Sequence, residues 1–157
     1  MESRVRPFRI REWRPSDRPH QDTFLRHLAR DDIRMRFGVT HLFAEDLFPA
    51  TASARRGSAF AAWDGSDAIV GVANLMLLDA ASAELAVIVR SDRKRRGLGR
   101  ALIVHSLRSA ALRGLVRVVG YVLAENTPML TLARAMDFRC VHRDASLVEV
   151  SRPAGFV

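Results

Sequence analysis

The chain has 157 residues, of which 48% are hydrophobic, and its formal net charge at pH 7 is +8. This length suits one domain and leaves no room for two of ordinary size, while the hydrophobic content is too high for a wholly disordered chain. We therefore expect a single domain over residues 1–157. The one cysteine, Cys140, excludes an internal disulfide and is typical of a reducing compartment.

A leader or a membrane segment is not expected. The first residues, MESRVRPFRIREW, lack the uninterrupted apolar core of a signal peptide. No apolar run approaches the roughly 18 residues that a membrane-spanning helix needs. These features predict a cytoplasmic protein with no membrane partner. The positive charge suits a polyanion, such as a nucleic acid or a phosphate-rich cofactor.

The first third of the chain begins with a strand and continues with helices. Apolar and polar residues alternate from Phe8 to Trp13, which predicts the strand. Pro15-Ser16-Asp17 is typical of a helix start. Helices are predicted over residues 20–30, over a short segment from Asp31-Asp32 to Phe37, and around residues 42–48 before Pro49.

The middle of the chain predicts a hairpin, a central strand and a long helix. Strands over residues 58–63 and 68–77 flank the turn Asp64-Gly65-Ser66-Asp67. Residues 84–90 are β-rich and apolar on both faces, which is typical of a central strand. The helix over residues 98–113 is expected to end near Gly114, with one apolar stripe of Leu98, Ala101, Leu102, His105 and Leu112.

The last third predicts a strand, a helix and two closing strands. The strand covers residues 116–122, and Asn126 is a good N-cap for a helix that runs to Met136. The closing strands cover residues 138–142 and 146–151. An antiparallel meander followed by a β–α–β–α unit predicts an α/β fold with a mixed sheet of about six to seven strands.

The stretch SDRKRRGLGRA lies between the central strand and the long helix. The first N–H groups of a helix lack internal partners and carry partial positive charge, and glycines let them turn toward one anion. Gly97 and Gly99 therefore predict a phosphate-binding loop. A Walker motif is absent, and Leu102 stands where a dinucleotide-binding loop has its third glycine. A solvated basic turn and a nucleic-acid contact are the alternatives, although no recognition element is visible for the latter.

Two segments together resemble the GNAT family of N-acetyltransferases. VIVRSDRKRRGLGRALI resembles the family's coenzyme A motif, Gln/Arg-x-x-Gly-x-Gly/Ala at a helix start, with Lys94 in the place of the Gln or Arg. VLAENTPMLTLARAMDF resembles its second signature, in which Asn126 and Phe138 match and Asp137 replaces a glycine. The order of elements is also the family's order, so the resemblance implies a single GNAT-type domain whose sheet is splayed at the acetyl-CoA strand by a bulge.

The resemblance implies how acetyl-CoA binds. The pyrophosphate is expected on the loop, and the pantetheine arm is expected to pair with the main chain of the central strand. A main-chain N–H there would polarise the thioester carbonyl. Asn126 is expected either to touch the pantetheine or to serve only as an N-cap. The implied binding residues are Val87, Ile88, Val89, Lys94, Arg95, Arg96, Gly97, Leu98, Gly99, Arg100 and Asn126.

The resemblance also implies direct attack of a neutral amine on the thioester, which requires a general base. Glu84 is the candidate, because AELAVIV resembles the AEFAVVV-type strand of bacterial protein lysine acetyltransferases. An ordinary solvent-facing carboxylate is the alternative. The position where many GNAT enzymes carry a general-acid tyrosine is Ala133, and the only tyrosine, Tyr121, lies on the preceding strand. A thiolate leaving group does not require such an acid.

The acceptor side points to the same subgroup. LARDDIRMRFG resembles its LSxEDxYxRFF helix, with Arg36-Phe37 in register, and this segment is expected over the acceptor site. We therefore expect acetyl transfer to a protein lysine, with a small-molecule amine or a non-catalytic CoA-binding sensor as alternatives. The five histidines form no i, i+4 pair and no cluster with the cysteine, so no metal site is expected.

Overall fold

The computed structural model describes residues 8–37, 47–48 and 57–155. A seven-stranded sheet runs through it in the order β1-β2-β3-β4-β5-β7-β6. Its strands are β1 (Arg9–Glu12), β2 (Gly57–Trp63), β3 (Ile69–Leu77), β4 (Ser82–Val89), β5 (Arg117–Leu123), β6 (Arg139–His142) and β7 (Leu147–Pro153). The helices are α1 (Gln21–Arg26), α2 (Arg30–Phe37), α4 (Leu98–Leu112) and α5 (Thr127–Ala135), with 3-10 turns η1 (Pro15–His20) and η2 (Ser91–Arg93).

The sheet is mixed, and β4 is its middle strand. Every pairing is antiparallel except that of β4 with β5, which is parallel. The predicted α/β class, the mixed sheet and the central place of β4 are confirmed. The apolar character of β4 on both faces has a direct cause, since Leu85 and Val87 pack toward α4 while Ile88 packs on the opposite side.

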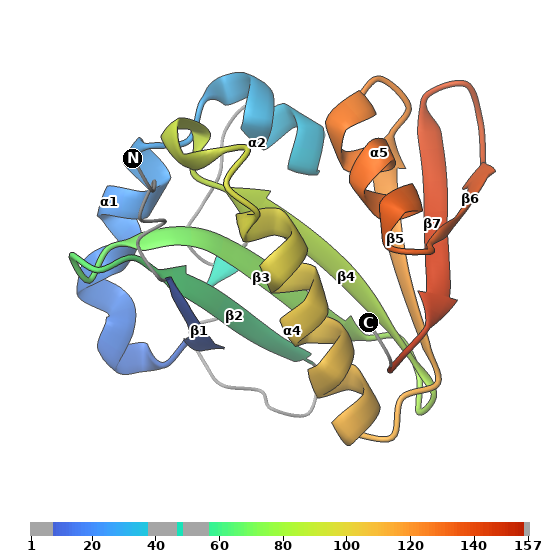
Figure 1. Cartoon of the computed structure of the whole chain (residues 1–157), viewed down its shortest axis with the longest axis horizontal. Coiled ribbons are helices and arrows are strands. Elements are labelled where there is room, and N and C mark those ends of the chain that lie inside the picture. Colours follow the sequence, from blue (N-terminus) through green and yellow to red (C-terminus); the bar gives the residue numbers. More distant parts are fainter. Residues whose placement is uncertain (1–7, 38–46, 49–56, 156–157) are drawn as a thin grey trace, which may run out of the picture.

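Two apolar clusters lie on the two faces of the sheet. The larger one joins the strands to α4 and α5 and includes Leu102, Leu107 and Val118. The smaller one joins β2, β3 and β4 to the N-terminal helices through Phe24, Ile33 and neighbouring side chains. Figure 1 shows α4 crossing one face of the sheet, α5 over the strands β5 and β7, and α2 above the gap between β4 and β5.

Some predicted helices differ from the observed ones. The helix predicted over residues 20–30 ends at Arg26, and α2 begins only at Arg30. The predicted stripe on α4 is wrong at its end, because Leu112 is 90% exposed while Ile103, Leu107 and Ala110 are buried. Leu112 lies about 200° around the helix from the buried Ala110, so its side chain points away from the sheet. The helix predicted around residues 42–48 lies almost entirely outside the described residues.

The sheet opens between β4 and β5. The two strands pair only from Ser82 to Glu84, opposite Arg117 to Val119. Beyond that point β4 continues beside β3, β5 continues beside β7, and the two diverge beneath α2 (Figure 1). The opening predicted for this strand is present, but the bulge expected to cause it is not, because the β3–β4 register runs without a shift from Gly71 to Leu77.

Candidate active site

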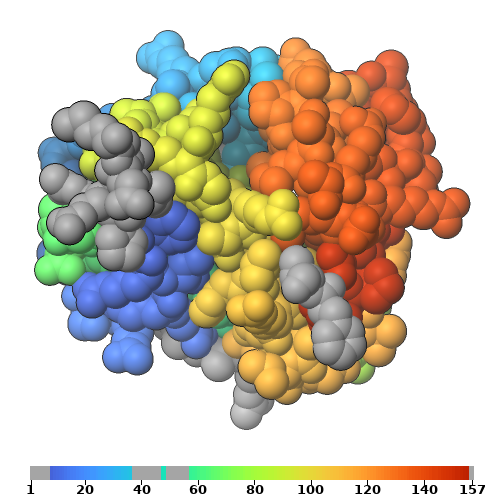
Figure 2. Space-filling model, viewed as in Figure 1, coloured from blue at the N-terminus to red at the C-terminus, as the bar shows by residue number. Residues whose placement is uncertain are grey.

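A cleft of about 510 Å³ lies in the opening between β4 and β5. Its walls are β4 from Leu85 to Val89, β5 from Gly120 to Val122, the first turn of α4, and α5. Helix α2 contributes Asp32, Met35 and Arg36 at one end. Figure 2 shows this face hollowed between the yellow start of α4 and the orange α5, below α2. The cleft therefore joins the predicted phosphate-binding loop to the central strand.

The main chain of β4 is exposed to this cleft on one side. The Arg90 N–H donates to the Val70 carbonyl over 2.9 Å, and hydrogen-bonded positions alternate along an antiparallel pair. The alternation turns the main chain of Ile88 toward β3 and the main-chain groups of Val87 and Val89 toward β5. Since β5 has diverged there, Val87 and Val89 present strand hydrogen-bonding groups to the cleft.

The glycine loop leads into α4 through a left-handed turn. Gly97 precedes α4 with φ of 78°, and Arg95 also has a positive φ, 61°. Ala101 is the first residue of α4 whose N–H bonds back, to the Gly97 carbonyl over 3.0 Å. The N–H groups of Leu98, Gly99 and Arg100 therefore lack partners within the helix and lie at its positive end.

The two glycines of the loop have different structural reasons. A Cβ on Gly97 would meet nothing within 4 Å, so the left-handed backbone is what requires glycine there. A Cβ on Gly99 would lie 3.3 Å from Leu132 Cδ2, so this glycine allows α4 to approach α5 closely. One glycine shapes the loop, and the other sets the packing behind it.

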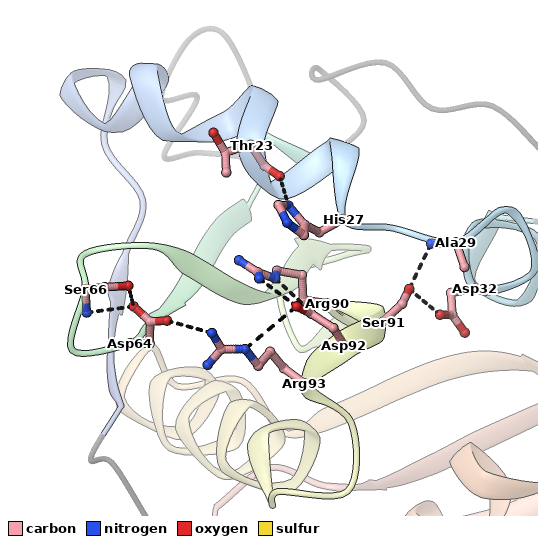
Figure 3. Close-up of polar contacts among 10 residues, drawn as sticks. All are labelled: Thr23, His27, Ala29, Asp32, Asp64, Ser66, Arg90, Ser91, Asp92 and Arg93. Atoms are coloured by element: carbon pink, nitrogen blue, oxygen red, sulfur yellow. Dashed lines mark hydrogen bonds and ion pairs between the residues drawn. The ribbon is translucent and has the colours of Figure 1, made fainter.

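The cationic residues of the loop divide into two groups. Arg90 is buried and forms two hydrogen bonds to Asp92, both of 2.7 Å, which hold the pKa of that carboxyl down at about 2 (Figure 3). Arg93 reaches Asp64 Oδ2 at 3.4 Å, in the turn between β2 and β3. Lys94 forms an ion pair with Asp32 of α2. These three cations hold the loop against neighbouring elements.

The second group consists of Arg95, Arg96 and Arg100, which are exposed. Within the described ranges, none of the three forms an ion pair with a carboxylate. Arg95 and Arg100 line the cleft. Arg95 and Arg100 are therefore the cationic side chains of this second group that an anion in the cleft can reach.

Glu84 lies at the narrow end of the opening. It pairs with Val119 of β5 and with Met76 of β3, and it shares a face with Ala86 and Ile88. Its side chain is half-buried and has no hydrogen bond or ion pair with another described residue. Ala86 lines the cleft, whereas Glu84 lies just below its lining.

Asn126 and Asp137 mark the two ends of the region around α5. The Asn126 side chain accepts a hydrogen bond of 3.3 Å from the Met129 N–H, as predicted for an N-cap, and it also lines the cleft. Asp137 has φ of 64°, so it adopts the left-handed conformation for which the resembling motif carries glycine. Ala133, where a tyrosine was considered, is buried.

A model of the acetyltransferase (GNAT) family matches residues 10–138. The chain belongs to that family. This GNAT protein is accordingly an acyltransferase of the N-acetyltransferase type. Metal-ligand clusters of three or more His, Cys, Asp or Glu were not found in the part of the chain that the structure describes. In the same part, no helix is long and apolar enough to cross a membrane.

Several solved structures share this fold. The GNAT domain of S. lividans PAT has a TM-score of 0.85 and 19% identity, over 93% of this chain and 90% of that one. Spermidine N-acetyltransferase from Vibrio cholerae, in complex with CoA and spermine, has a TM-score of 0.76 and 18% identity, over 94% and 95%. The ribosomal-protein-S18-alanine N-acetyltransferase from Escherichia coli has a TM-score of 0.73 and 17% identity, over 96% of each chain.

The structure adds cleft residues to those found in the sequence of this GNAT enzyme. Asp32, Met35 and Gly120 line the cleft, and Tyr121 joins them with an exposed fraction of 47%. Asp32 and Met35 belong to the segment that the resemblance placed over the acceptor site, although neither was named there as a site residue. Gly120 and Tyr121 belong to no motif, and only the fold brings them to the cleft. Strand periodicity places Tyr121 on the same face as Val119, which is two residues away. Because Val119 pairs with Glu84, Tyr121 lies on the same face of the sheet as Glu84. The Phe37 side chain lies outside the described part.

Proposed function

We propose that this protein transfers the acetyl group of acetyl-CoA to the primary amine of a lysine side chain on a protein. The observation that carries the proposal is the opening between β4 and β5, which ends at the N–H groups of the glycine loop. Acetyl-CoA has a pyrophosphate followed by an amide-rich arm. These two parts match the loop N–H groups and the open main chain of β4, which follow one another along the cleft.

The cleft offers acetyl-CoA two kinds of contact. The free N–H groups of Leu98, Gly99 and Arg100 suit the pyrophosphate, and the exposed Arg95 and Arg96 add charge. The main-chain groups of Val87 and Val89 suit the amides of the pantetheine arm. Ile88 differs from these two, because its main chain faces β3 and its side chain packs in the core. Its expected contribution is to hold the strand in place.

The reaction we propose is a direct attack. A neutral amine nitrogen forms a bond to the thioester carbonyl carbon, the carbon–sulfur bond breaks, and CoA leaves as its thiolate. The amine begins mostly protonated, since a lysine amine has a pKa near about 10.4, so a base must take up a proton. The thiolate resembles that of cysteine, with a pKa near about 8.5, and can leave without a tyrosine acid.

Glu84 is the proposed base, acting through a water molecule. Val87, the first open main-chain position above it, is three residues away, which is roughly 10 Å along a strand. That span exceeds the reach of a glutamate carboxylate alone and suits one intervening water. Glu84 is half-buried and has no cation partner among the described residues, so its carboxylate is free to take up a proton.

The charges of the cleft favour an amine with a single positive charge. Asp32 is the one acidic side chain lining the cleft in the described part, and it is already paired with Lys94. A polyamine carries several positive charges, which a cleft with one paired carboxylate does not balance. A lysine side chain carries one positive charge, and Glu84 lies near the narrow end. The exposed Tyr121, on the same face, offers a ring against the alkyl chain.

The test of Glu84 is the substitution Glu84→Gln, measured by thiol release from acetyl-CoA with a lysine peptide. Loss of the base is expected to lower kcat by about a hundredfold or more, with little change in the KM for acetyl-CoA. Glu12→Gln is the matched control, because Glu12 is an exposed strand glutamate on β1, outside the cleft lining. A Glu84→Gln enzyme equal to wild type from about pH 6 to about pH 9 would remove Glu84 from the mechanism.

The acceptor is tested by mass spectrometry of a proteome incubated with acetyl-CoA and either wild type or Glu84→Gln. We expect new acetyl groups on lysine side chains in the sample with wild type and none in the sample with Glu84→Gln. Acetylation of added small amines without protein acetylation would favour the small-molecule alternative. Tight CoA binding without any thiol release would instead identify a non-catalytic CoA sensor.

A further inference from the structure

Helix α2 is attached to the start of the glycine loop through Ser91. The Ser91 hydroxyl accepts a hydrogen bond of 2.8 Å from the Ala29 N–H, just before α2, and donates one of 2.5 Å to Asp32 Oδ2 in its first turn (Figure 3). The Ser91 N–H also donates to the His27 carbonyl over 3.2 Å. A residue after β4 thus supplies the hydroxyl that holds the start of a helix about sixty residues earlier in the chain.

The second oxygen of Asp32 pairs with Lys94 of the loop. Oδ1 accepts from the Lys94 ammonium, while Oδ2 accepts from Ser91. The Asp32 side chain is 16% exposed and lines the cleft, and that of Lys94 is 51% exposed. Lys94 therefore stands between a largely buried carboxylate and the region assigned to the pyrophosphate.

The other end of α2 is attached to the opposite wall. Arg34 forms an ion pair with Glu125, the residue before the Asn126 cap of α5. The following residues, Met35 and Arg36, line the cleft. Helix α2 therefore spans the opening from the loop after β4 to the loop after β5, and its middle faces the space between them.

We propose that Asp32 is a positioning residue that couples cosubstrate binding to acceptor binding. This inference rests on the proposed use of acetyl-CoA. A lysine ammonium has three donors, so Lys94 can bridge Asp32 and a phosphate oxygen at once. Lys94 and Asp32 are already paired in the structure. A phosphate that accepts from the same ammonium restricts its movement, which fixes α2 and with it the wall formed by Met35 and Arg36. Asp32 acts through Lys94 and α2, without contact to the reacting atoms.

Coupling of this kind is reciprocal and can be measured by binding alone. The probes are CoA and a short peptide with a single lysine, titrated separately and then together by calorimetry. In wild type, saturating CoA is expected to tighten peptide binding by about fivefold or more, and saturating peptide to tighten CoA binding by the same factor.

The substitution Asp32→Ala is expected to abolish this factor. The affinity for CoA alone should stay within about threefold of wild type, because the loop N–H groups and Arg95 remain. The matched control is Asp31→Ala, since Asp31 belongs to the same turn but contacts Arg34 within α2 rather than the loop. Asp31→Ala should keep the wild-type factor. Asp32→Asn, which keeps an oxygen for Ser91, serves as a second variant should the alanine variant unfold.

Three results would overturn the proposal. The first is that CoA and peptide do not affect each other's affinity in wild type. The second is that both Asp32 variants keep the full coupling factor. The third is that Asp32→Ala weakens the binding of CoA alone by as much as it weakens the coupling. The last result would show that Asp32 contributes only to CoA binding at the loop. A wild type that binds no CoA at all would instead refute the proposed function. In that case amide exchange of α2 in ligand-free Asp32→Ala, compared with Asp31→Ala, still shows whether Asp32 fixes the helix.

Discussion

At the scale of single residues, the loop depends on glycine for a backbone reason at one position and a packing reason at the other. Gly97 has φ of 78° in open space, and Gly114, after α4, has φ of 77°, also with nothing within 4 Å. The two glycines are thus alike in conformation and surroundings, but only Gly97 lies at the cleft. Substitutions at the two glycines therefore allow the effect of backbone strain on stability to be measured apart from its effect on CoA binding.

We predict that Gly97→Ala and Gly114→Ala each lower the free energy of unfolding by about 1 kcal/mol, because an L-residue is strained in the left-handed region. Urea unfolding measures this loss. Only Gly97→Ala should weaken CoA binding, by about tenfold, because relief of the strain turns the N–H groups after it away from the cleft. Equal CoA affinity in the two variants would show that the loop conformation does not contribute to binding.

The loop cations show what residue-level patterns leave undetermined. The run from Arg93 to Arg96 reads as one basic patch in the sequence. In the structure Arg93 and Lys94 are paired with carboxylates, while Arg95 and Arg96 are exposed. The partners are Asp64 and Asp32, which lie some thirty and sixty residues away in the chain. A local pattern shows the number of charges but carries no information on which of them are neutralised by tertiary contacts.

At the scale of elements, α5 begins at a residue with two possible roles. Asn126 caps the helix through Met129 and also lines the cleft. We predict that Asn126→Ala lowers the free energy of unfolding by about 1 kcal/mol, and that Asn126→Ser retains most of it because a hydroxyl also caps. Urea unfolding of the two variants measures the difference.

The KM for acetyl-CoA then separates the two roles of Asn126. If Asn126 acts only as a cap, the KM should rise in Asn126→Ala and remain near wild type in Asn126→Ser. A similar rise in both variants would assign the side-chain amide a contact with the pantetheine arm. Equal stability of all three proteins would contradict the capping role.

The sequence predicted most elements because their signals are local. Asn126 and Gly114 mark a helix start and a helix end through their own conformations, and the turn from Asp64 to Asp67 carries its own side-chain hydrogen bonds. The opening at β4 was expected from the family resemblance, but the expected cause, a bulge, was wrong. Strand divergence after Glu84 depends on which neighbour each strand follows, and this is a property of the whole sheet.

At the scale of the whole molecule, stability in acid depends on paired carboxylates. The pKa of Asp17 is lowered by two 2.7 Å hydrogen bonds from Arg11, and that of Glu149 by Arg143 and Arg117. The pKa of Asp92 falls to about 2 beside Arg90. A lowered pKa in the folded state stabilises the fold above the unfolded value near about 4, and this contribution is lost as the pH falls toward the folded value.

We therefore predict that the urea midpoint falls most steeply between about pH 4 and about pH 2. A smaller decline is expected to begin below about pH 6.5, because burial lowers the pKa of His105. Asp17→Asn should lower the free energy of unfolding by about 2 kcal/mol at neutral pH, because it removes a hydrogen-bonded charge pair of low exposure, and should make the acid fall shallower. Asp22→Asn, at an exposed position of α1, is the control. An unchanged acid profile in Asp17→Asn would show that this pair does not contribute.

The divergence of β4 and β5 also leaves part of the middle strand without a neighbour on one side. For several residues the middle strand of the sheet behaves as an edge strand, with main-chain groups that lack a neighbour. Edges of this kind can pair with strands of other chains and lead to aggregation. Here α4 and α5 form the walls around this edge. If the pantetheine arm pairs with these main-chain groups as proposed, its binding is expected to leave fewer unpaired strand groups and so to lower the tendency of the protein to self-associate.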